Sequence, residues 1–212
     1  CEYYSNRDGY EAVGVTHREL DIEDFVAVSA FIKAIRPDYV LHCAAISNTG
    51  TCERNPVLSE KVNVRGTINL AKACRNAGSR MIFTSSDQIY NTSHSLEPNR
   101  EGSEGKPGNV YGRDKKRAEE AMLTYLPDAV ALRLTWMYDA PSRGRAAGQG
   151  LLQKLADALK DRREVEFPVH DYRGITYVWE VVRHLEEAMG LPGGVYNFGS
   201  ENRYNTFDTA RL

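Results

Sequence analysis

MIFTSSDQIY, residues 81–90, is the stretch of sequence that decides the fold. Its first three residues, 81–83, form a short apolar run after a turn, and such a run predicts a buried strand of a parallel sheet. Ligands of open α/β sheets bind beyond the carboxyl ends of the strands, which is where Ser86 and Asp87 lie. The stretch therefore predicts an α/β sheet that carries a hydroxyl group at its ligand-binding edge.

A tyrosine and a lysine follow at helical spacing. Residues 111–125 show apolar side chains three to four positions apart, so Tyr111 and Lys115 share one face of a predicted helix. A free phenol titrates near ~10, and a neighbouring ammonium favours the phenolate and lowers that pKa. Tyr111 can then exchange a proton with a carbinol oxygen that the Ser86 hydroxyl holds by a hydrogen bond.

This is the equipment for reversible hydride transfer at a carbonyl when a nicotinamide is present. A tyrosine and a lysine at this spacing also occur on ordinary surface helices. The strand-end Ser86, 25 positions before Tyr111, favours the catalytic interpretation.

The arrangement resembles the extended short-chain dehydrogenase/reductase family, and the resemblance covers nearly the whole chain. It implies a Ser86–Tyr111–Lys115 catalytic set. Further segments that are similar to family motifs are Val40–Ala45, Asn63–Thr67, Glu101 with Pro107, Asn109–Gly112, Ala131–Trp136 and Gly194–Gly199.

Within this family, the pattern looks most like the sugar-nucleotide reductases of the dTDP-4-dehydrorhamnose reductase type. The resemblance implies a sugar pocket lined by Ser86, Asp87, Gln88 and Trp136. Arg173 would approach the diphosphate, or alternatively would form a local salt bridge. Sugar-nucleotide dehydratases of the family carry a Glu where this chain has Gln88, and an amide cannot abstract a proton, so dehydration is disfavoured.

The cofactor side is expected near the first strands. An Arg after the second strand of a dinucleotide fold suits a 2′-phosphate, so Arg18 favours NADP(H) over NAD(H), unless it is only a solvated residue of a polar turn. Asp21 and Ile22 match the segment beside the adenine, although Asp21 could instead cap the helix that follows. The other residues that the resemblance places at the cofactor are Cys43, Ala44, Ala45, Asn63, Tyr111 and Lys115, with plain structural hydrogen bonding as the alternative role of Asn63.

The fold that we expect is a Rossmann-like doubly wound parallel sheet with a small C-terminal α/β substrate lobe. The Gly-rich turn that meets the pyrophosphate in this family does not occur, so the first βα unit is expected to be absent from this sequence. We assign residues 1–138 to dinucleotide binding and 139–212 to substrate binding, and expect the lobe to continue after its last residue. Predicted elements include strands at 12–15, 39–45 and 165–169, and helices at 25–35 and 151–159.

Composition places few other limits on function. The formal net charge of −2 gives no reason to expect nucleic acid or a membrane surface as a partner. No apolar run approaches ~18 residues, and we expect a cytoplasmic protein with reduced cysteines and no metal site. Arg143 and Arg145 lie in a predicted loop and could bind substrate phosphates, although the simpler interpretation is that both side chains are solvated.

The sequence thus favours NAD(P)H-dependent reduction of a keto group on a nucleotide-linked sugar. The alternatives are a nucleotide-sugar 4-epimerase, which uses the same three residues, and a non-catalytic dinucleotide-binding regulatory subunit. The sequence does not name the sugar, and it leaves the oligomeric state open, with a homodimer as one candidate.

Overall fold

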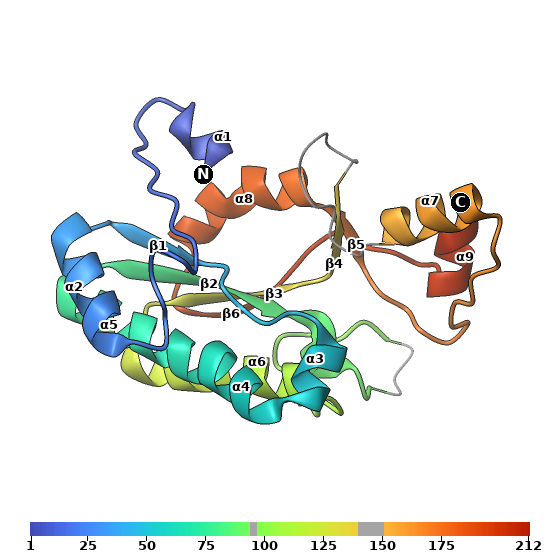
Figure 1. Ribbon diagram of the computed structural model, residues 1–212, viewed down its shortest axis with the longest axis horizontal. Helices are drawn as coiled ribbons and strands as arrows, with labels where there is room; N and C mark the ends of the chain where they lie inside the picture. The colour runs from blue at the N-terminus through green and yellow to red at the C-terminus, as the bar shows by residue number, and fades with distance from the viewer. Residues whose placement is uncertain (94–96, 140–150) are drawn as a thin grey trace. The chain divides into compact units, whose positions relative to one another are not determined.

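The computed structural model describes residues 1–93, 97–139 and 151–212. They form two compact units (Figure 1). The first unit comprises Cys1–Arg133 and Glu187–Asn197, and the second comprises Leu134–Glu186 and Phe198–Leu212. The assignment of cofactor binding to residues 1–138 and of substrate binding to 139–212 stays a prediction.

A four-stranded sheet forms the centre of the first unit. Its strand order is β1-β2-β3-β6, and β1 pairs with β2 in parallel, from Tyr39 opposite Arg80 to His42 opposite Phe83. Among the strands of this sheet, the buried apolar residues lie on the middle strands β2 and β3, as the run at 81–83 predicted for β2. The bounds are β1 Tyr39–His42, β2 Arg80–Ser86, β3 Val130–Leu134 and β6 Gly194–Phe198.

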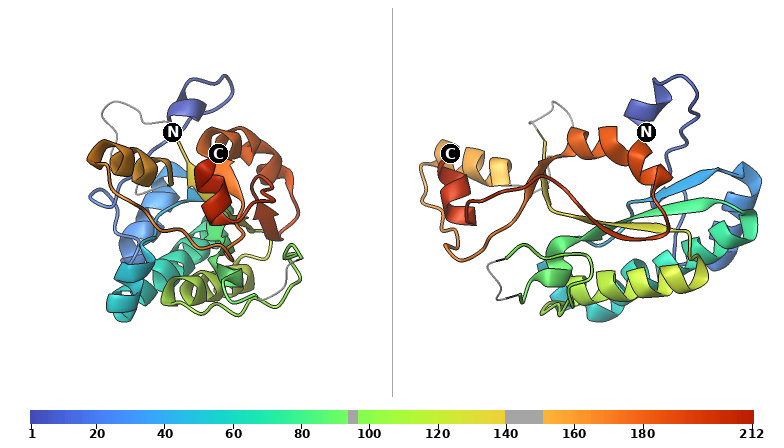
Figure 2. Two further views of the ribbon diagram at one scale, coloured as in Figure 1. Left: turned by 90° about the vertical axis from the view of Figure 1, so that its right-hand side faces the viewer. Right: turned by 180° about the vertical axis from the view of Figure 1, so that it is seen from behind.

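Three helices cover one face of this sheet. They are α2 (Phe25–Ile35), α5 (Thr67–Ala77) and α6 (Val110–Tyr125), and they lie side by side on the same side of the strands in both Figure 1 and the reverse view of Figure 2. Each turns an apolar stripe to the sheet, because apolar residues recur three to four positions apart. The buried core between them consists of Val28, Ile32, Leu70, Ala71, Ala73, Cys74, Met81, Phe83, Ala118, Met122, Leu126, Ala129 and Ala131.

A helix with a widened turn leads into α5. Short helix α3 (Thr49–Arg54) begins after the capping residue Asn48, and α4 (Pro56–Glu60) begins with a proline after the capping residue Asn55. Residues Lys61–Gly66 then form a π-helical segment, η1, which continues directly into α5. Such segments often lie at functional sites.

The N-terminal part differs from the prediction. Beyond the short helix α1 (Glu2–Ser5), residues 12–15 form no strand, and β1 ends at His42 rather than at residue 45. A strand needs a hydrogen-bonded neighbour, and no strand of the described residues pairs with 12–15. The helix predicted at 25–35 is confirmed, but its N-cap is Asp24, whose carboxylate accepts hydrogen bonds from two backbone N–H groups.

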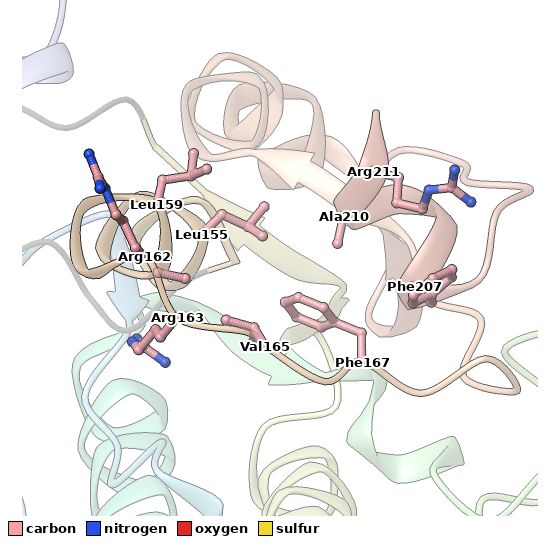
Figure 3. Close-up of a pocket in the computed structure, with 10 residues that line it drawn as sticks. Leu155, Leu159, Arg162, Arg163, Val165, Phe167, Phe207, Ala210 and Arg211 are labelled. Carbon is pink, nitrogen blue, oxygen red and sulfur yellow. The ribbon is translucent and has the colours of Figure 1, made fainter.

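The second unit contains a small parallel pair of strands, β4 (Trp136–Tyr138) with β5 (Ile175–Tyr177). Helix α7 (Leu151–Asp161) confirms the helix predicted from residue 151, whereas the strand predicted at 165–169 does not form. Instead Val165 and Phe167 line a pocket of about 400 Å³ between α7 and α9 (Thr206–Arg211) (Figure 3). The residues that line this pocket include none of the predicted site residues. Helix α8 (Val178–Gly190) is shared by the two units.

Among the described residues, no helix is both long and apolar enough to cross a membrane.

Arg80, the first residue of β2, connects neighbouring parts of the chain at that end of the sheet. The Arg80 guanidinium donates hydrogen bonds to the carbonyl oxygens of Asp128, at 3.0 Å, and of Met189 and Leu191. These carbonyls belong to the turns that precede β3 and β6, so one side chain fixes both turns. The turn before β6 packs so closely that a Cβ at Gly193 would lie 2.0 Å from the carbonyl oxygen of Pro127.

We therefore expect Gly193→Ala to lower the free energy of unfolding by about 2 to 3 kcal/mol, because the methyl group would meet rigid backbone. The matched control is Gly190→Ala, where a Cβ meets nothing within 4 Å, so the change should stay within about 1 kcal/mol. Urea denaturation of both variants measures the difference. Equal stabilities would show that the turn can move away at little cost.

Candidate active site

Ser86 lies at the carboxyl end of β2, as predicted. It is the last residue of the strand and the N-cap of the short 3₁₀ helix η2 (Asp87–Tyr90), where its Oγ accepts the backbone N–H of Gln88 at 3.2 Å. The Ser86 hydroxyl lies close enough to the phenol of Tyr111 to lower the pKa of that phenol. Tyr111 and Lys115 lie one turn apart on α6, and both are buried. The structure therefore brings these three residues together.

Three polar side chains fix the start of α6, and with it the position of Tyr111. Asn109 is the N-cap and accepts the backbone N–H of Gly112 at 2.7 Å, while Glu53 accepts the N–H of Val110 at 2.6 Å. The Gln88 side-chain oxygen accepts from Asn109 at 2.8 Å. Gln88, predicted to line the sugar pocket, is thus bonded to the helix cap. An Asn before a helical pattern is readable in sequence, whereas no local signal identifies Glu53.

The pKa of Tyr111 differs from the sequence-based expectation. Burial raises the pKa of Tyr111 to about 12. The Ser86 hydroxyl lowers this pKa in part, and the Asp87 carboxylate raises it further. The expectation of a lowered pKa was wrong, because burial of the phenol outweighs the influences that favour the phenolate. Tyr111 is therefore a neutral phenol at physiological pH and is ready to donate its proton.

Lys115 is directed at the backbone of β2. Its Nζ donates to the carbonyl oxygen of Thr84 at 2.8 Å and lies 4.5 Å from the centre of the Phe83 ring, compared with 5.7 Å from that of Tyr111. Burial lowers the pKa of Lys115 to about 8. One carbonyl and one aromatic face compensate for only part of the lost hydration of an ammonium.

His42 lies at the carboxyl end of β1 and is kept neutral. Burial, with the nearby charge of Lys115 as the second cause, lowers its pKa to about 3. Its Nε2 lies 2.9 Å from the Thr67 hydroxyl, which itself donates to the carbonyl oxygen of Asn63. Since that hydroxyl has one proton and donates it to Asn63, His42 must carry its own proton on Nε2. Neither His42 nor Thr67 was identified from the sequence.

Asn63 is bonded to the backbone of the segment that follows β1. Its side-chain oxygen accepts the backbone N–H of Ile46 at 2.8 Å, and its amide nitrogen donates to the Ile46 carbonyl at 3.1 Å. The same nitrogen donates to Ser59 at 3.2 Å, and Ser59 donates to the Asp114 carboxylate at 2.6 Å. Burial raises the pKa of Asp114. Sequence reasoning missed Ser59 and Asp114.

A buried ion pair joins α6 to β3. The Arg133 guanidinium donates to both carboxylate oxygens of Glu119, with a shortest distance of 2.7 Å, and also bonds to the Tyr90 hydroxyl. In the loop before α6, Glu101 accepts the backbone N–H of Asn197 from β6 at 3.0 Å, and this bond lowers its pKa. These contacts hold the loop between Ser86 and Tyr111 against the sheet.

Of the residues predicted to face the cofactor, those that precede β1 or directly follow it are exposed or only partly buried. Arg18 is exposed, and the neighbouring Glu19 carboxylate is occupied by Thr16, whose N–H and hydroxyl both donate at 2.7 Å. Asp21 accepts the N–H of Glu23 rather than capping α2, and Ile22 packs over Gly66 of η1. Cys43 and Ala44 are exposed and Ala45 is partly buried; the expectation that Cys43 lies within a strand was wrong, because β1 ends at His42.

Two predicted substrate residues meet in the second unit. The Arg173 guanidinium lies 5.3 Å from the centre of the Trp136 ring, a distance typical of a cation–π contact. Arg143 and Arg145 fall outside the described residues. Within the part of the chain that the structure describes, no cluster of three or more His, Cys, Asp or Glu residues is arranged to hold a metal ion.

The buried ammonium of Lys115 has lost part of its hydration without full compensation, so we expect the fold to become more stable when this charge is removed. Lys115→Met should raise the free energy of unfolding at pH 7 by about 1 to 2 kcal/mol. Because the folded pKa is about 8 and the unfolded value is 10.5, the cost of the ammonium is complete below pH 8 and disappears as the pH rises to 10.5.

Urea denaturation at pH 7 and at high pH measures this difference, which should shrink as the pH rises. Lys33→Met, at an exposed position of α2, is the control and should change stability by less than about 0.5 kcal/mol. A Lys115→Met variant that is less stable at pH 7 would show that the ammonium stabilises the fold.

The chain is similar to several known proteins. The chain is 30% identical to a dTDP-4-dehydrorhamnose reductase of Mycolicibacterium smegmatis over 96% of its length and 61% of the relative's. It is 32% identical to a methionine adenosyltransferase 2 subunit beta of Xenopus laevis over 99% of its length and again 61% of the relative's. The chain thus spans less than two thirds of the length of these two relatives.

The fold is that of a solved structure, dTDP-4-dehydrorhamnose reductase from Bacillus anthracis in complex with NADP. The TM-score is 0.88 at 21% identity, over 99% of this chain and 74% of that one, and it confirms the predicted Rossmann-like α/β fold. A family model described as RmlD substrate binding domain matches residues 3–212. The chain therefore belongs to the RmlD substrate binding domain family, as its resemblance to the extended short-chain dehydrogenase/reductases led us to expect.

Proposed function

We propose that the chain reduces a keto group on a nucleotide-linked sugar with NADPH. The observation that carries this proposal is a neutral, buried phenol, Tyr111, beside Ser86 at the carboxyl end of β2. A bound dihydronicotinamide would supply the hydride. The relatives that bear the name dTDP-4-dehydrorhamnose reductase support the same class of substrate.

The two hydroxyl groups divide the work at the carbonyl. Ser86 donates a hydrogen bond to the carbonyl oxygen and holds it beside the phenol. Tyr111 gives its proton to that oxygen as negative charge develops there. A pKa of about 12 keeps the phenol protonated until that moment, which suits the direction of reduction.

Lys115 acts on this step through its charge. When Tyr111 has lost its proton, the ammonium 5.7 Å from the ring centre stabilises the phenolate. Its hydrogen bond to the Thr84 carbonyl keeps it at that distance. We further propose that its remaining N–H groups hold the nicotinamide ribose.

The residues around β1 fit an NADP(H) molecule. Cys43, Ala44 and Ala45 present small side chains that leave room for a dinucleotide. The Glu19 carboxylate is already bonded to Thr16, so the exposed Arg18 is the charged group available to a 2′-phosphate. Asp21 and Ile22 would lie beside the adenine, and Asn63 would act only through the backbone of Ile46.

For the sugar nucleotide, we propose Asp87 and Trp136 at the sugar and Arg173 at the diphosphate. The Arg173 guanidinium lies 5.3 Å from the centre of the Trp136 ring, and guanidinium groups suit the recognition of phosphate oxygens. Gln88 would shape the pocket through the Asn109 cap rather than by direct contact. A cytoplasmic location and a homodimer stay predictions.

A regulatory dinucleotide-binding subunit is the second candidate. It is favoured by the 32% identity to a methionine adenosyltransferase 2 subunit beta. Such a role can retain the three residues for binding alone. Turnover is the property that separates the two candidates.

Tyr111→Phe removes only the proton donor, so kcat/KM with NADPH and a dTDP-4-keto sugar should fall by about 10² to 10⁴. The Kd for NADPH, measured by nicotinamide fluorescence, should stay within about twofold, since hydride donor and pocket are unchanged. NADPH binding without turnover in the wild-type chain would instead support the regulatory subunit.

Cysteine alkylation tests the cofactor position separately. Cys1 and Cys43 are exposed, whereas Cys52 and Cys74 are buried. At an NADPH concentration of ten times the Kd, alkylation of Cys43 should slow by about tenfold, and that of Cys1 should not change. Mass spectrometry of the two labelled peptides measures both rates in one sample. Equal rates at Cys43 with and without NADPH would contradict the proposed position.

A further inference from the structure

We propose that Asp114 and Ser59 are positioning residues that set the cofactor-facing segment Cys43–Ile46 in register with the helix that carries Tyr111 and Lys115. Asp114 neighbours Lys115 in sequence but faces away from the strand end, toward α4. From its carboxylate, a continuous line of hydrogen bonds runs through Ser59 and Asn63 to the backbone of Ile46.

Every member of this line is withdrawn from solvent. Ser59 is fully buried, Asn63 is 1% exposed and Asp114 is 4% exposed. Buried polar groups are costly unless they are bonded, so the line has few alternative arrangements. Its bonds span 55 positions between Ser59 and Asp114 and 17 between Asn63 and Ile46. It therefore links three elements that are distant in the sequence.

The Asp114 side chain and the backbone of Ile46 together determine which group donates and which accepts in each hydrogen bond of this line. Ser59 donates its single proton to a side-chain oxygen of Asp114. The Ser59 oxygen is then free to accept from Asn63, which turns the NH₂ end of that amide toward Ser59. The oxygen of Asn63 is thereby aimed at the N–H of Ile46. The two bonds to Ile46 require this orientation of the Asn63 amide, and Asp114 supports it through Ser59.

The segment needs this support because it has no regular structure. Residues 43–47 lie between the end of β1 and Asn48, the N-cap of α3, and none of them belongs to a strand or helix. Asn63 satisfies both backbone groups of Ile46, and the Cys52 thiol adds a 3.3 Å contact to the same carbonyl. Loss of the orientation of Asn63 would release both groups of Ile46 together.

Amide hydrogen exchange of the full chain measures this coupling without a cofactor. In Ser59→Ala and Asp114→Ala, exchange of the peptide that holds residues 43–48 should accelerate by about tenfold. Asp114→Asn keeps an acceptor for Ser59 and should exchange like the wild type. Glu120→Ala, at an exposed position of α6, is the matched control and should also leave this peptide unchanged.

Cofactor affinity measures the consequence, and this second part rests on the proposed function. Ser59→Ala and Asp114→Ala should weaken NADPH binding by about five- to tenfold with less than a twofold change in kcat, and Asp114→Asn should restore the affinity. Thermal unfolding of each variant identifies any general loss of the fold.

The outcomes separate the two ideas. If the wild-type chain binds no dinucleotide, the proposed function fails, and exchange of the 43–48 peptide still decides the coupling. Unchanged exchange in Ser59→Ala would overturn the coupling. So would an Asp114→Asn variant that exchanges as fast as Asp114→Ala, since a lost charge rather than a lost acceptor would then be the cause.

Discussion

A buried lysine ammonium is the constraint on which the first unit depends. Lys115 has one carbonyl, that of Thr84, and the face of Phe83 in place of its water. Both groups belong to β2, so the position of α6 along its own axis is fixed relative to the end of that strand. The neighbouring His42 is neutral, chiefly because it is buried and secondly because of the Lys115 charge, and its Nε2 lies 2.9 Å from the Thr67 hydroxyl. The ammonium therefore ties α6 to β2 and contributes to the neutral state of His42 on β1.

The other faces of the same helix explain why it cannot rotate. Asp114 is bonded to Ser59 on one side, and Glu119 is bonded to Arg133 on another. Buried ion pairs contribute little net stability, but breaking one leaves a costly unpaired charge. Alternative rotations of α6 would break several such bonds together. The phenol of Tyr111 is thus held in place by charges that do not contact it.

Sequence reasoning succeeded where the signal is local. The apolar run 81–83 identified the central strand, and the four-residue spacing to Lys115 placed Tyr111 correctly on a helix face. It failed where partners are distant. The bond between Ser59 and Asp114 spans 55 positions, and residues 12–15 form no strand because pairing depends on a neighbour. The pKa of Tyr111 was misjudged for the same reason, since burial is a property of the whole fold.

The π-helical segment η1 explains how one helix serves several neighbours. Ser59, Asn63 and Thr67 are spaced by four residues and bond to α6, to the segment after β1 and to β1 itself. In a regular α-helix each step of four residues turns the side chain by about 40°, and a wider turn reduces that drift. In an alignment of related chains, those that keep the row of Ser59, Asn63 and Thr67 should therefore carry the one-residue insertion of η1. A related chain that lacks this insertion would need different polar residues to bond the same three neighbours.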